Sequence, residues 1–214
     1  MMAYSTYIFD LDGTLLDTLG DLAASTNYAL RTHGMPEHSI DDVRRFVGNG
    51  VRKLMERAIP DGAHNPDFEA TFATFRQYYM QHSLDTTQPY EGISETLAAL
   101  KAKGCRLAVV SNKMMAATQE LCQHFFPDTI EVAIGENEAA GIRKKPAPDT
   151  VYAALDVLGE GKGNAVYVGD SDVDIQTAAN AGLPCISVLW GFRDKAFLTE
   201  NGAKTFISTP SELL

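Results

Sequence analysis

The chain has 214 residues, of which 45% are hydrophobic and 21% charged, so it can bury a sizeable core and is excluded from the class of disordered proteins. Its 28 acidic and 18 basic side chains give a formal net charge of −10, which disfavours general binding to nucleic acid or to anionic membranes. An anionic substrate must therefore be attracted by a local group of positive charges.

Short apolar runs alternate with helical patterns along most of the chain, which is typical of βα units around a parallel sheet. The expected strands, in chain order, are Tyr4–Phe9, Cys105–Val110, Glu131–Ile134, Ala165–Val168, Cys185–Leu189 and a small edge strand, Thr205–Ile207. The helices expected between them are Ile93–Lys103, Met114–Phe126, Pro148–Leu158 and Val173–Ala181. This order predicts an α/β fold with a parallel sheet.

Residues 18–82 interrupt the alternation, because they show helical periodicity without any strand-like run. The positions with this spacing are Leu19, Leu22, Ala23, Thr26, Ala29 and Leu30, then Val51, Leu54, Met55, Ala58 and Ile59, and finally the aromatic stripe Phe68, Phe72, Phe75 and Tyr79. Such stripes predict the core of a helix bundle. We therefore expect a core domain of residues 1–16 and 89–214, with an all-helical domain of residues 17–88 inserted into it.

Polar clusters lie where the predicted strands end. They are Asp10–Thr14 after the first strand, Ser111–Lys113 after the second, Arg143–Pro146 past the third and Gly169–Asp174 after the fourth. In an open parallel sheet, ligands bind at the carboxyl ends of the strands. The four clusters are therefore expected to meet at one edge of the sheet.

The residue types in these clusters fit phosphoryl transfer. Several carboxylates close together favour a hard cation with oxygen ligands, which indicates Mg²⁺. An ionised carboxylate needs no base to act as a nucleophile, and a second acid two residues away can protonate a leaving alcohol and then deprotonate water. Hydroxyl, amide and lysine groups can hold the phosphoryl oxygens. The expected reaction therefore passes through an aspartyl-phosphate.

In their order and spacing, the four clusters resemble the motifs of the haloacid dehalogenase superfamily. The resemblance implies a Rossmann-like three-layered core with a helical cap between the first two motifs. It implies that Asp10 is the nucleophile and Asp12 the general acid and base. Mg²⁺ would be held by the Asp10 carboxylate, the Asp12 backbone carbonyl and Asp170, with Asp174 supporting the metal site from behind. Lys145 would offset the negative charge of Asp10 and the phosphate.

Further roles follow from the same resemblance. Ser111 would bind phosphoryl oxygens, and Thr14 and Asn112 are further candidates for contact with the phosphate or substrate. For Asp172, a place at the start or cap of a helix competes with a direct role in metal binding. The Asp at position 12 favours phosphate esters over carbon–halogen bonds, since the dehalogenases of the superfamily lack it.

Two stretches suggest a substrate. Phe46–Ala58 and Leu189–Phe192 resemble segments of bacterial phosphoglycolate phosphatases, which makes 2-phosphoglycolate the leading candidate. The residues that would contact the substrate are Gly48, Asn49, Gly50 and Arg52, with Lys53 as an alternative to Arg52. The competing interpretation is an ordinary turn followed by a solvated basic helix face.

Other functions fit the same motifs. They are a β-phosphoglucomutase-like phosphosugar mutase, a phosphatase for sugar phosphates, nucleotides or pyrophosphate, and a binding protein that keeps the fold without turnover. The expected partner is a small phosphorylated metabolite, and neither nucleic acid nor a membrane is expected. Three scattered cysteines and the absence of a signal-peptide pattern favour a cytoplasmic protein. The expected oligomeric state is a monomer or homodimer.

Overall fold

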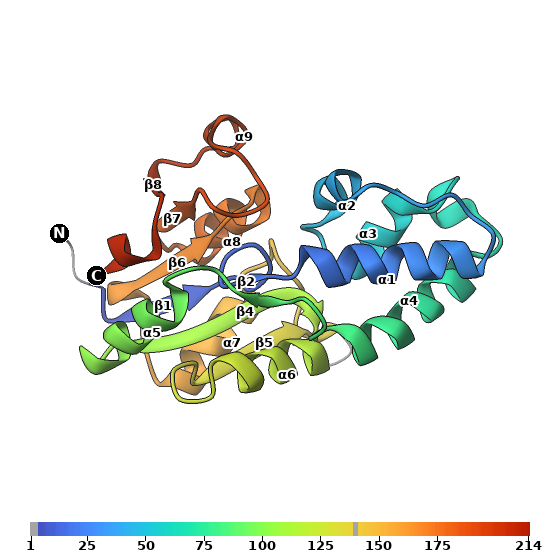
Figure 1. Ribbon diagram of the computed structural model, residues 1–214. Coiled ribbons are helices and arrows are strands. Elements are labelled where there is room, and N and C mark those ends of the chain that lie inside the picture. Colours follow the sequence, from blue (N-terminus) through green and yellow to red (C-terminus); the bar gives the residue numbers. More distant parts are fainter. Residues whose placement is uncertain (1–3, 139–140) are drawn as a thin grey trace. The chain divides into compact units, whose positions relative to one another are not determined.

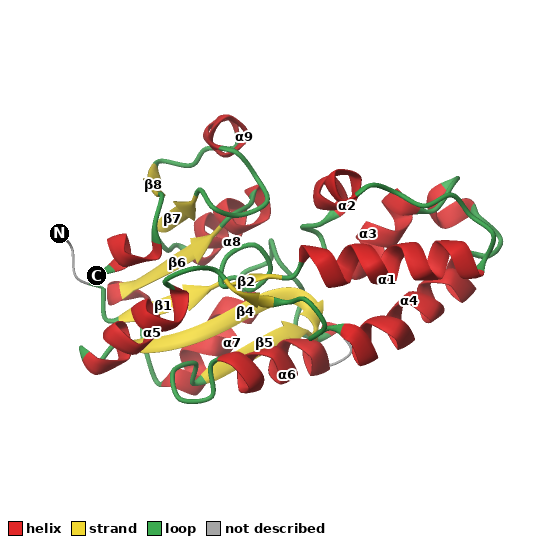
Figure 2. Cartoon of the chain, viewed as in Figure 1, coloured by secondary structure: helices red, strands yellow, loops and turns green. Residues whose placement is uncertain are grey.

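The computed structural model describes residues 4–138 and 141–214 and separates the chain into two compact units. One unit comprises residues 1–16 and 89–214, and the other comprises residues 17–88. The first contains a six-stranded sheet flanked by helices, whereas the second is helical (Figures 1 and 2). The predicted α/β fold with a parallel sheet is confirmed. The role of the helical unit as a cap stays a prediction.

The sheet of the first unit is parallel, and its strands follow the order β5-β4-β1-β6-β7-β8 (Figure 1). The strands are β1 (Thr6–Phe9), β4 (Arg106–Met114), β5 (Val132–Glu136), β6 (Ala165–Gly169), β7 (Cys185–Val188) and β8 (Thr205–Ile207). At the carboxyl end of β1, Phe9 pairs with Val109 of β4 and Val168 of β6. The loops after these three neighbouring strands therefore emerge side by side at one edge.

Helices cover both faces of this sheet. They are α5 (Ile93–Ala102), α6 (Met115–Phe125), α7 (Asp149–Leu158) and α8 (Asp172–Ala181). A further short helix, α9 (Lys195–Glu200), follows β7. Successive residues of a strand point to opposite faces. Accordingly, Tyr7 and Phe9 pack in a cluster with residues of α5 and α6, whereas Ile8 packs in a second cluster with residues of α7 and α8. This unit is therefore a three-layered α/β core.

The second strand of the predicted series is longer than expected. It was expected to end at Val110, but β4 continues to Met114, and its pairing with β5 shifts register between Val110 and Met114. The polar residues Ser111–Lys113 thus lie within the strand, in its irregular part, and not in a loop behind it. Helix α9 was not predicted, because its six residues are too few to show a helical period.

The second unit contains four α-helices and a short 3₁₀ turn within residues 17–88. They are α1 (Leu19–Thr32), α2 (Ile40–Phe46), α3 (Val51–Ala58), η1 (Gly62–His64) and α4 (Phe68–His82). Its chain enters through β2 (Leu16–Asp17) and leaves through β3 (Gln88–Pro89), two short strands that pair with each other. The apolar positions predicted for α1 and α3 are buried. Among the described residues, no helix is both long and apolar enough to cross a membrane.

The aromatic stripe of α4 is only partly a core. Phe68, Phe75 and Tyr79 are buried, as expected for a bundle core. Phe72 is half-buried, and its ring lies 5.4 Å from the guanidinium carbon of Arg52. The expectation that all four aromatic residues form the core was therefore wrong for Phe72, because this side of α4 faces a cation at the surface.

A buried carboxylate joins the beginning and the end of the helical unit. Asp21 on α1 is 2% exposed and accepts hydrogen bonds from the amides of Thr86 and Thr87, at 2.9 and 3.0 Å. The hydroxyl groups of the same two threonines donate to it at 2.6 and 2.7 Å. These four donor groups satisfy a carboxylate that would otherwise be costly to bury, so the exit segment is held against α1.

The core of the helical unit can be tested at Phe75. We expect Phe75→Ala to lower the free energy of unfolding of this unit by about 3–5 kcal/mol, because the ring is 0% exposed and its loss leaves a cavity. The exposed neighbour Gln77, changed to Ala, serves as the matched control and should alter stability by less than about 0.5 kcal/mol. Denaturant titration followed by circular dichroism measures both variants, and equal effects would contradict the packing described here.

Candidate active site

Asp10 stands directly behind the central strand β1. Its amide donates to the carbonyl oxygen of Val168 at 2.9 Å, so the backbone at Asp10 is still held by β6. The chain then turns tightly, with the carbonyl oxygen of Leu11 accepting from the amides of Thr14, Leu15 and Leu16 at 3.3, 3.0 and 3.0 Å. This turn fixes the backbone from which the Asp10 and Asp12 side chains project.

Gly13 allows the turn to approach the loop behind β6. Its φ is +84°, a conformation that favours glycine, and a Cβ at this position would lie 2.4 Å from Oδ2 of Asp170. Any larger residue would collide with that carboxylate. The glycine therefore brings the first and fourth motifs into contact.

A buried lysine connects two carboxylates. The ammonium nitrogen of Lys145 lies 2.8 Å from Oδ1 of Asp10 and 2.8 Å from Oδ1 of Asp174, and its side chain is 2% exposed. The ammonium also donates to the hydroxyl oxygen of Tyr167 at 3.1 Å, and that hydroxyl donates to Asp174 at 2.9 Å. Burial lowers the pKa of Lys145, but the carboxylates of Asp10 and Asp174 outweigh burial and hold it above the ordinary value. Lys145 therefore stays charged.

Asp174 is saturated with hydrogen bonds. Its Oδ1 accepts from Lys145 and Tyr167, while its Oδ2 accepts from the amide of Ser171 at 3.1 Å and from the hydroxyl of Ser171 at 2.6 Å. Ser171 and Asp174 together cap the start of α8, with Asp172 as the first residue of the helix. Asp172 thus has the helix-start position expected of it, and Ser171 provides the cap.

The remaining carboxylates are costly to ionise without a further cation. Burial raises the pKa of Asp10 well above its ordinary value, and the charge of Asp174 raises it further despite the nearby Lys145. Burial likewise raises the pKa of Asp170 to about 7, again with a contribution from Asp174. A positive charge placed between Asp10 and Asp170 would favour the ionised form of both.

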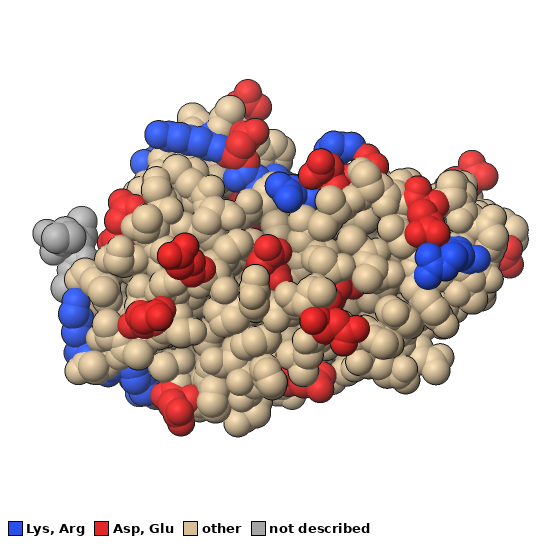
Figure 3. Space-filling model, in the orientation of Figure 1, with Lys and Arg blue, Asp and Glu red and all other residues tan. Residues whose placement is uncertain are grey.

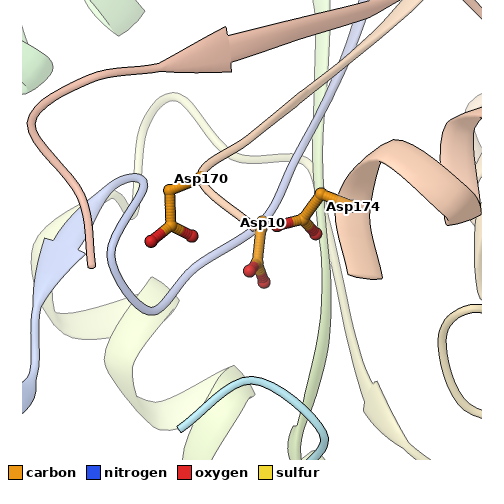
Figure 4. A group of neighbouring side chains, drawn as sticks. All are labelled: Asp10, Asp170 and Asp174. Atoms are coloured by element: carbon orange, nitrogen blue, oxygen red, sulfur yellow. The ribbon is translucent and has the colours of Figure 1, made fainter. Parts of the chain in front are cut away.

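The carboxylates gather as a metal site requires. Asp10, Asp170 and Asp174 each offer an oxygen within 4.8 Å of those of the other two (Figure 4). They come from three places, namely the end of β1, the loop after β6 and the first turn of α8. Because both oxygens of Asp174 already accept two hydrogen bonds each, Asp10 and Asp170 are the better placed to hold a cation directly.

Asp12 is paired with a different lysine. The ammonium nitrogen of Lys113, on β4, lies 2.9 Å from Oδ1 of Asp12, and the Lys113 side chain is 1% exposed. Together with Asp10, Asp170, Asp174 and Lys145, this pair gives the site four carboxylates and two ammonium groups among the described residues. Fully ionised, these groups carry a formal charge of two negative, which a divalent cation with a preference for oxygen neutralises.

The positive charge of the site lies inside the protein. On the face drawn in Figure 3, basic side chains are interspersed with acidic ones. Lys113 and Lys145, in contrast, are 1% and 2% exposed, and each contacts a carboxylate. Attraction of an anionic substrate by these two buried lysines stays a prediction.

The structure places the remaining predicted residues of the core unit at the same edge. Asn112 brackets the backbone of Lys145, with its Nδ2 donating to the carbonyl oxygen at 3.0 Å and its Oδ1 accepting from the amide at 2.8 Å. The hydroxyl of Thr14 donates to Oδ1 of Asp170 at 3.4 Å. Ser111 is buried, and its hydroxyl accepts from the amide of Lys113 at 3.2 Å. Phosphate binding by these three residues stays a prediction.

The loop after β7 supports the same carboxylate. The amide of Phe192 donates to Oδ2 of Asp170 at 2.7 Å, and the indole nitrogen of Trp190 donates to the carbonyl oxygen of Thr14 at 3.0 Å. A Cβ on Gly191 would lie 2.4 Å from Cβ of Asp170 and 2.4 Å from the carbonyl oxygen of Gly13. This loop therefore fits closely against the first and fourth motifs.

The predicted residues of the helical unit have partners within that unit. Arg52 contacts Glu69 through both terminal nitrogens, at 2.5 and 3.2 Å, and Lys53 contacts Glu56 at 2.5 Å. Gly48, Asn49 and Gly50 form a partly exposed turn before α3, with φ values of 133° at Gly48 and 86° at Gly50. Their contact with substrate stays a prediction.

Arg57 was not predicted as part of this turn. It donates to Oδ1 of Asn49 at 2.6 Å and to the carbonyl oxygen of Phe46 at 2.7 Å. The one signal in the sequence was a basic residue two turns along the same helix, on a face expected to be solvated. The Asn49 side chain is therefore held by a neighbouring arginine.

Sequence reasoning also missed three groups in the core unit, namely Tyr167, Lys113 and the Trp190–Phe192 loop as a support of Asp170. Tyr167 lies within a strand predicted to be apolar, so its hydroxyl gave no signal. Lys113 lies beside Ser111 and Asn112 in the second motif, and this position was the one signal in the sequence.

Comparison with known proteins agrees with this geometry. A family model described as haloacid dehalogenase-like hydrolase matches residues 7–188. The chain is 36% identical over 186 residues to a phosphoglycolate phosphatase of Aquifex aeolicus, covering 86% of this chain and 84% of that protein. The chain therefore belongs to the haloacid dehalogenase-like hydrolase family.

Two further similar proteins indicate the class of enzyme. A solved structure from Lactobacillus delbrueckii subsp. bulgaricus, of a protein provisionally named a phosphoglycolate phosphatase, has a TM-score of 0.94 and 37% identity over 99% of this chain and 97% of that one. The N-acetylmuramic acid 6-phosphate phosphatase of Pseudomonas aeruginosa is 29% identical and covers 100% of this chain and 94% of that protein. The predicted class of phosphoric monoester hydrolase is thus confirmed.

The close fit at Gly191 can be tested against a second glycine. We expect Gly191→Ala to lower the free energy of unfolding by about 1–3 kcal/mol, because the added methyl group must displace Asp170 or the Gly13 carbonyl. Gly163→Ala is the control, since a Cβ there meets no atom within 4 Å, and its effect should stay within about 0.5 kcal/mol. Denaturant titration measures both, and a neutral Gly191→Ala would contradict the packing of this loop.

Proposed function

We propose that this enzyme is a Mg²⁺-dependent phosphatase that hydrolyses 2-phosphoglycolate through an aspartyl-phosphate on Asp10. The observation that carries the proposal is the arrangement of Asp10, a nearly buried carboxylate that contacts Lys145 and lies among the oxygens of Asp170 and Asp174. The choice of substrate is supported by relatives named as phosphoglycolate phosphatases at 31–36% identity.

Mg²⁺ fits the donor set, which consists of oxygen atoms with a surplus of negative charge. Asp10 and Asp170 would hold it through their carboxylates and Asp12 through its backbone carbonyl, while Asp174 orients Lys145 and the start of α8. When bound, the cation offsets the negative charge that these carboxylates and a phosphate monoester bring together.

In the first step, Asp10 attacks the phosphorus atom. Both described contacts of its carboxylate, with the amide of Leu11 and with Lys145, fall on Oδ1, so Oδ2 is the oxygen that we assign to the attack. The bond between Asp10 and phosphorus forms as the bond between phosphorus and the ester oxygen breaks. Asp12 donates a proton to that oxygen, and an alcohol leaves.

In the second step, water hydrolyses the aspartyl-phosphate. Asp12, now deprotonated, accepts a proton from the attacking water, whose oxygen bonds to phosphorus. The bond between phosphorus and Asp10 breaks, which releases inorganic phosphate and restores both carboxyl groups. Lys145 stays charged throughout, so it offsets negative charge on Asp10 and on the phosphoryl group in both steps.

The nucleophile can be tested by a single substitution. We expect Asp10→Asn to reduce kcat by about 10³-fold or more, because an amide oxygen is a poor nucleophile at phosphorus. Asp156→Asn, on the exposed side of α7, is the matched control and should retain full activity. Phosphate release by purified, folded variants provides the measurement, and turnover by Asp10→Asn near that of the wild type would exclude Asp10 as the nucleophile.

The substrate requires a separate experiment. The N-acetylmuramic acid 6-phosphate phosphatase that covers the whole chain makes a sugar phosphate the second candidate. Values of kcat/KM for 2-phosphoglycolate, N-acetylmuramic acid 6-phosphate, glucose phosphates, nucleotides and pyrophosphate decide between them. The proposal predicts the highest value for 2-phosphoglycolate. A higher value for any other phosphate would refute the choice of substrate and leave the class of enzyme intact.

Metal binding should depend on pH. Burial raises the pKa of Asp170 to about 7, so below that pH the folded, metal-free protein holds a proton where a cation would bind. Since the folded state binds this proton more tightly than the unfolded state does, stability of the metal-free protein falls as the pH rises through about 7, and a bound cation restores it.

We therefore expect millimolar Mg²⁺ to raise the melting temperature more at about pH 8 than at about pH 5.5. Thermal unfolding with and without MgCl₂ at the two pH values measures the difference. Asp170→Asn serves as the control and should show only a small effect of Mg²⁺ at either pH. An effect of Mg²⁺ on the wild type that is equal at both pH values would contradict the role of Asp170.

We also propose a cytoplasmic location and action as a monomer or homodimer on a small metabolite. The support for the location is that Cys105, Cys122 and Cys185 form no disulfide. Fractionation of cells and gel filtration with light scattering test these two points.

A further inference from the structure

The two proposed steps give no role to the buried ammonium group of Lys113. Lys113 is 1% exposed at its side chain, and its ammonium nitrogen lies 2.9 Å from Oδ1 of Asp12, which is 14% exposed. A lysine this deeply buried is costly unless it contacts an opposite charge. The two steps assign roles to Asp10, Asp12 and Lys145, and neither step uses Lys113.

The backbone of Lys113 is fixed on several sides. Its amide donates to the hydroxyl of Ser111 at 3.2 Å, and its carbonyl oxygen accepts from the hydroxyl of Thr118 at 3.5 Å. Gly135 on β5 comes so close that a Cβ there would lie 2.7 Å from that same carbonyl oxygen. The shift of register between Val110 and Met114 lies here, so β4 departs from regular pairing where Lys113 reaches Asp12.

We propose that Lys113 is the positioning residue of the general acid and base, Asp12. Its ammonium group holds Oδ1 of Asp12, so the carboxyl plane is set and the transferred proton is carried on Oδ2. It also supplies a positive charge beside Asp12 in the interval between the two steps, when Asp12 has given up its proton and has not yet taken one from water. This inference rests on the proposed function, because it concerns how Asp12 acts in that reaction.

The role proposed for Lys113 predicts different losses of activity with two kinds of leaving group. The alkoxide formed from 2-phosphoglycolate needs a proton as it departs, whereas the p-nitrophenolate formed from p-nitrophenyl phosphate is stable without one. A well-positioned general acid contributes about 10²–10⁴-fold to a reaction that needs the proton. Loss of Lys113 should therefore slow reaction with the alkyl phosphate far more than reaction with the aryl phosphate.

The experiment compares kcat/KM of Lys113→Met for 2-phosphoglycolate and for p-nitrophenyl phosphate. This parameter covers the steps up to departure of the leaving group, so hydrolysis of the aspartyl-phosphate, which both substrates share, does not enter. We expect a loss of about 10²-fold with 2-phosphoglycolate and of less than about tenfold with the aryl phosphate. Equal losses with both substrates would overturn the proposal, because a structural defect affects both alike.

Further variants sharpen the comparison. Lys113→Arg keeps the positive charge and should recover most of the activity with 2-phosphoglycolate. Asp12→Asn should show the same dependence on leaving group, and adding Lys113→Met to it should cause little further loss, since the two residues act as one unit. A double variant whose losses multiply would overturn the proposal. Lys162→Met, at an exposed lysine, is the matched control and should match the wild type with both substrates.

Two other outcomes have defined meanings. If Lys113→Met does not fold, as thermal unfolding will show, Lys113→Gln replaces it with the same expected dependence on leaving group. If the wild type hydrolyses neither phosphate in the presence of Mg²⁺, the proposed function is wrong, and the role of Lys113 that rests on it is wrong as well. Wild-type turnover of both phosphates, combined with equal losses in the variants, overturns the role of Lys113 alone.

Discussion

The ammonium group of Lys145 holds this site together. It lies 2.8 Å from both Asp10 and Asp174, in a place where its side chain is 2% exposed. A charge at this depth is stable only with its partners, and the partners are stable only with it. Asp10, the helix start at Asp174 and the loop that carries Lys145 are therefore mutually dependent, although they are far apart in the sequence.

The fold brings the residues of that contact together. A parallel sheet brings the ends of β1, β4 and β6 to one edge, and each of these strands ends in, or is followed by, polar residues. The loop with Lys145 is fastened to β4 through the side chain of Asn112, which accepts from its amide and donates to its carbonyl oxygen. The hydroxyl of Tyr167, inside the central sheet, then joins Lys145 to Asp174. Even with both lysines charged, the cluster keeps a surplus of negative charge, which explains why a divalent cation suits it.

Much of this arrangement could be predicted from the sequence, because it follows from local rules. Strand ends in a parallel sheet share an edge, so the sequence alone predicts that Asp10, Asp170 and Asp174 lie together. Contacts made across the fold could not be predicted in the same way. Asn112 hydrogen-bonds to the backbone of Lys145, 33 positions away. No local sequence pattern predicts such a partner. Lys113 reaches Asp12 from a part of β4 whose pairing shifts register, whereas the sequence indicated a strand that ends at Val110.

In the helical unit, too, local patterns were predictable and contacts between distant residues were not. Its helices were predictable from apolar spacing, since burial of one face decides their positions. Spacing alone could not show that Phe72 would lie under a guanidinium group, nor that Asp21 would accept hydrogen bonds from four donor groups of Thr86 and Thr87. Both depend on side chains from distant positions, which periodicity does not encode.

The proposed reaction depends on a covalent bond between Asp10 and phosphorus. Acid quenching during turnover of 2-phosphoglycolate, followed by reduction with borohydride, converts an aspartyl-phosphate to homoserine, and mass spectrometry of the peptides locates the change. A covalent role of Asp10 predicts homoserine at position 10, only when substrate and Mg²⁺ are both present. Phosphoryl transfer to another residue, or turnover with no modification of Asp10 under conditions that trap the intermediate, would contradict it.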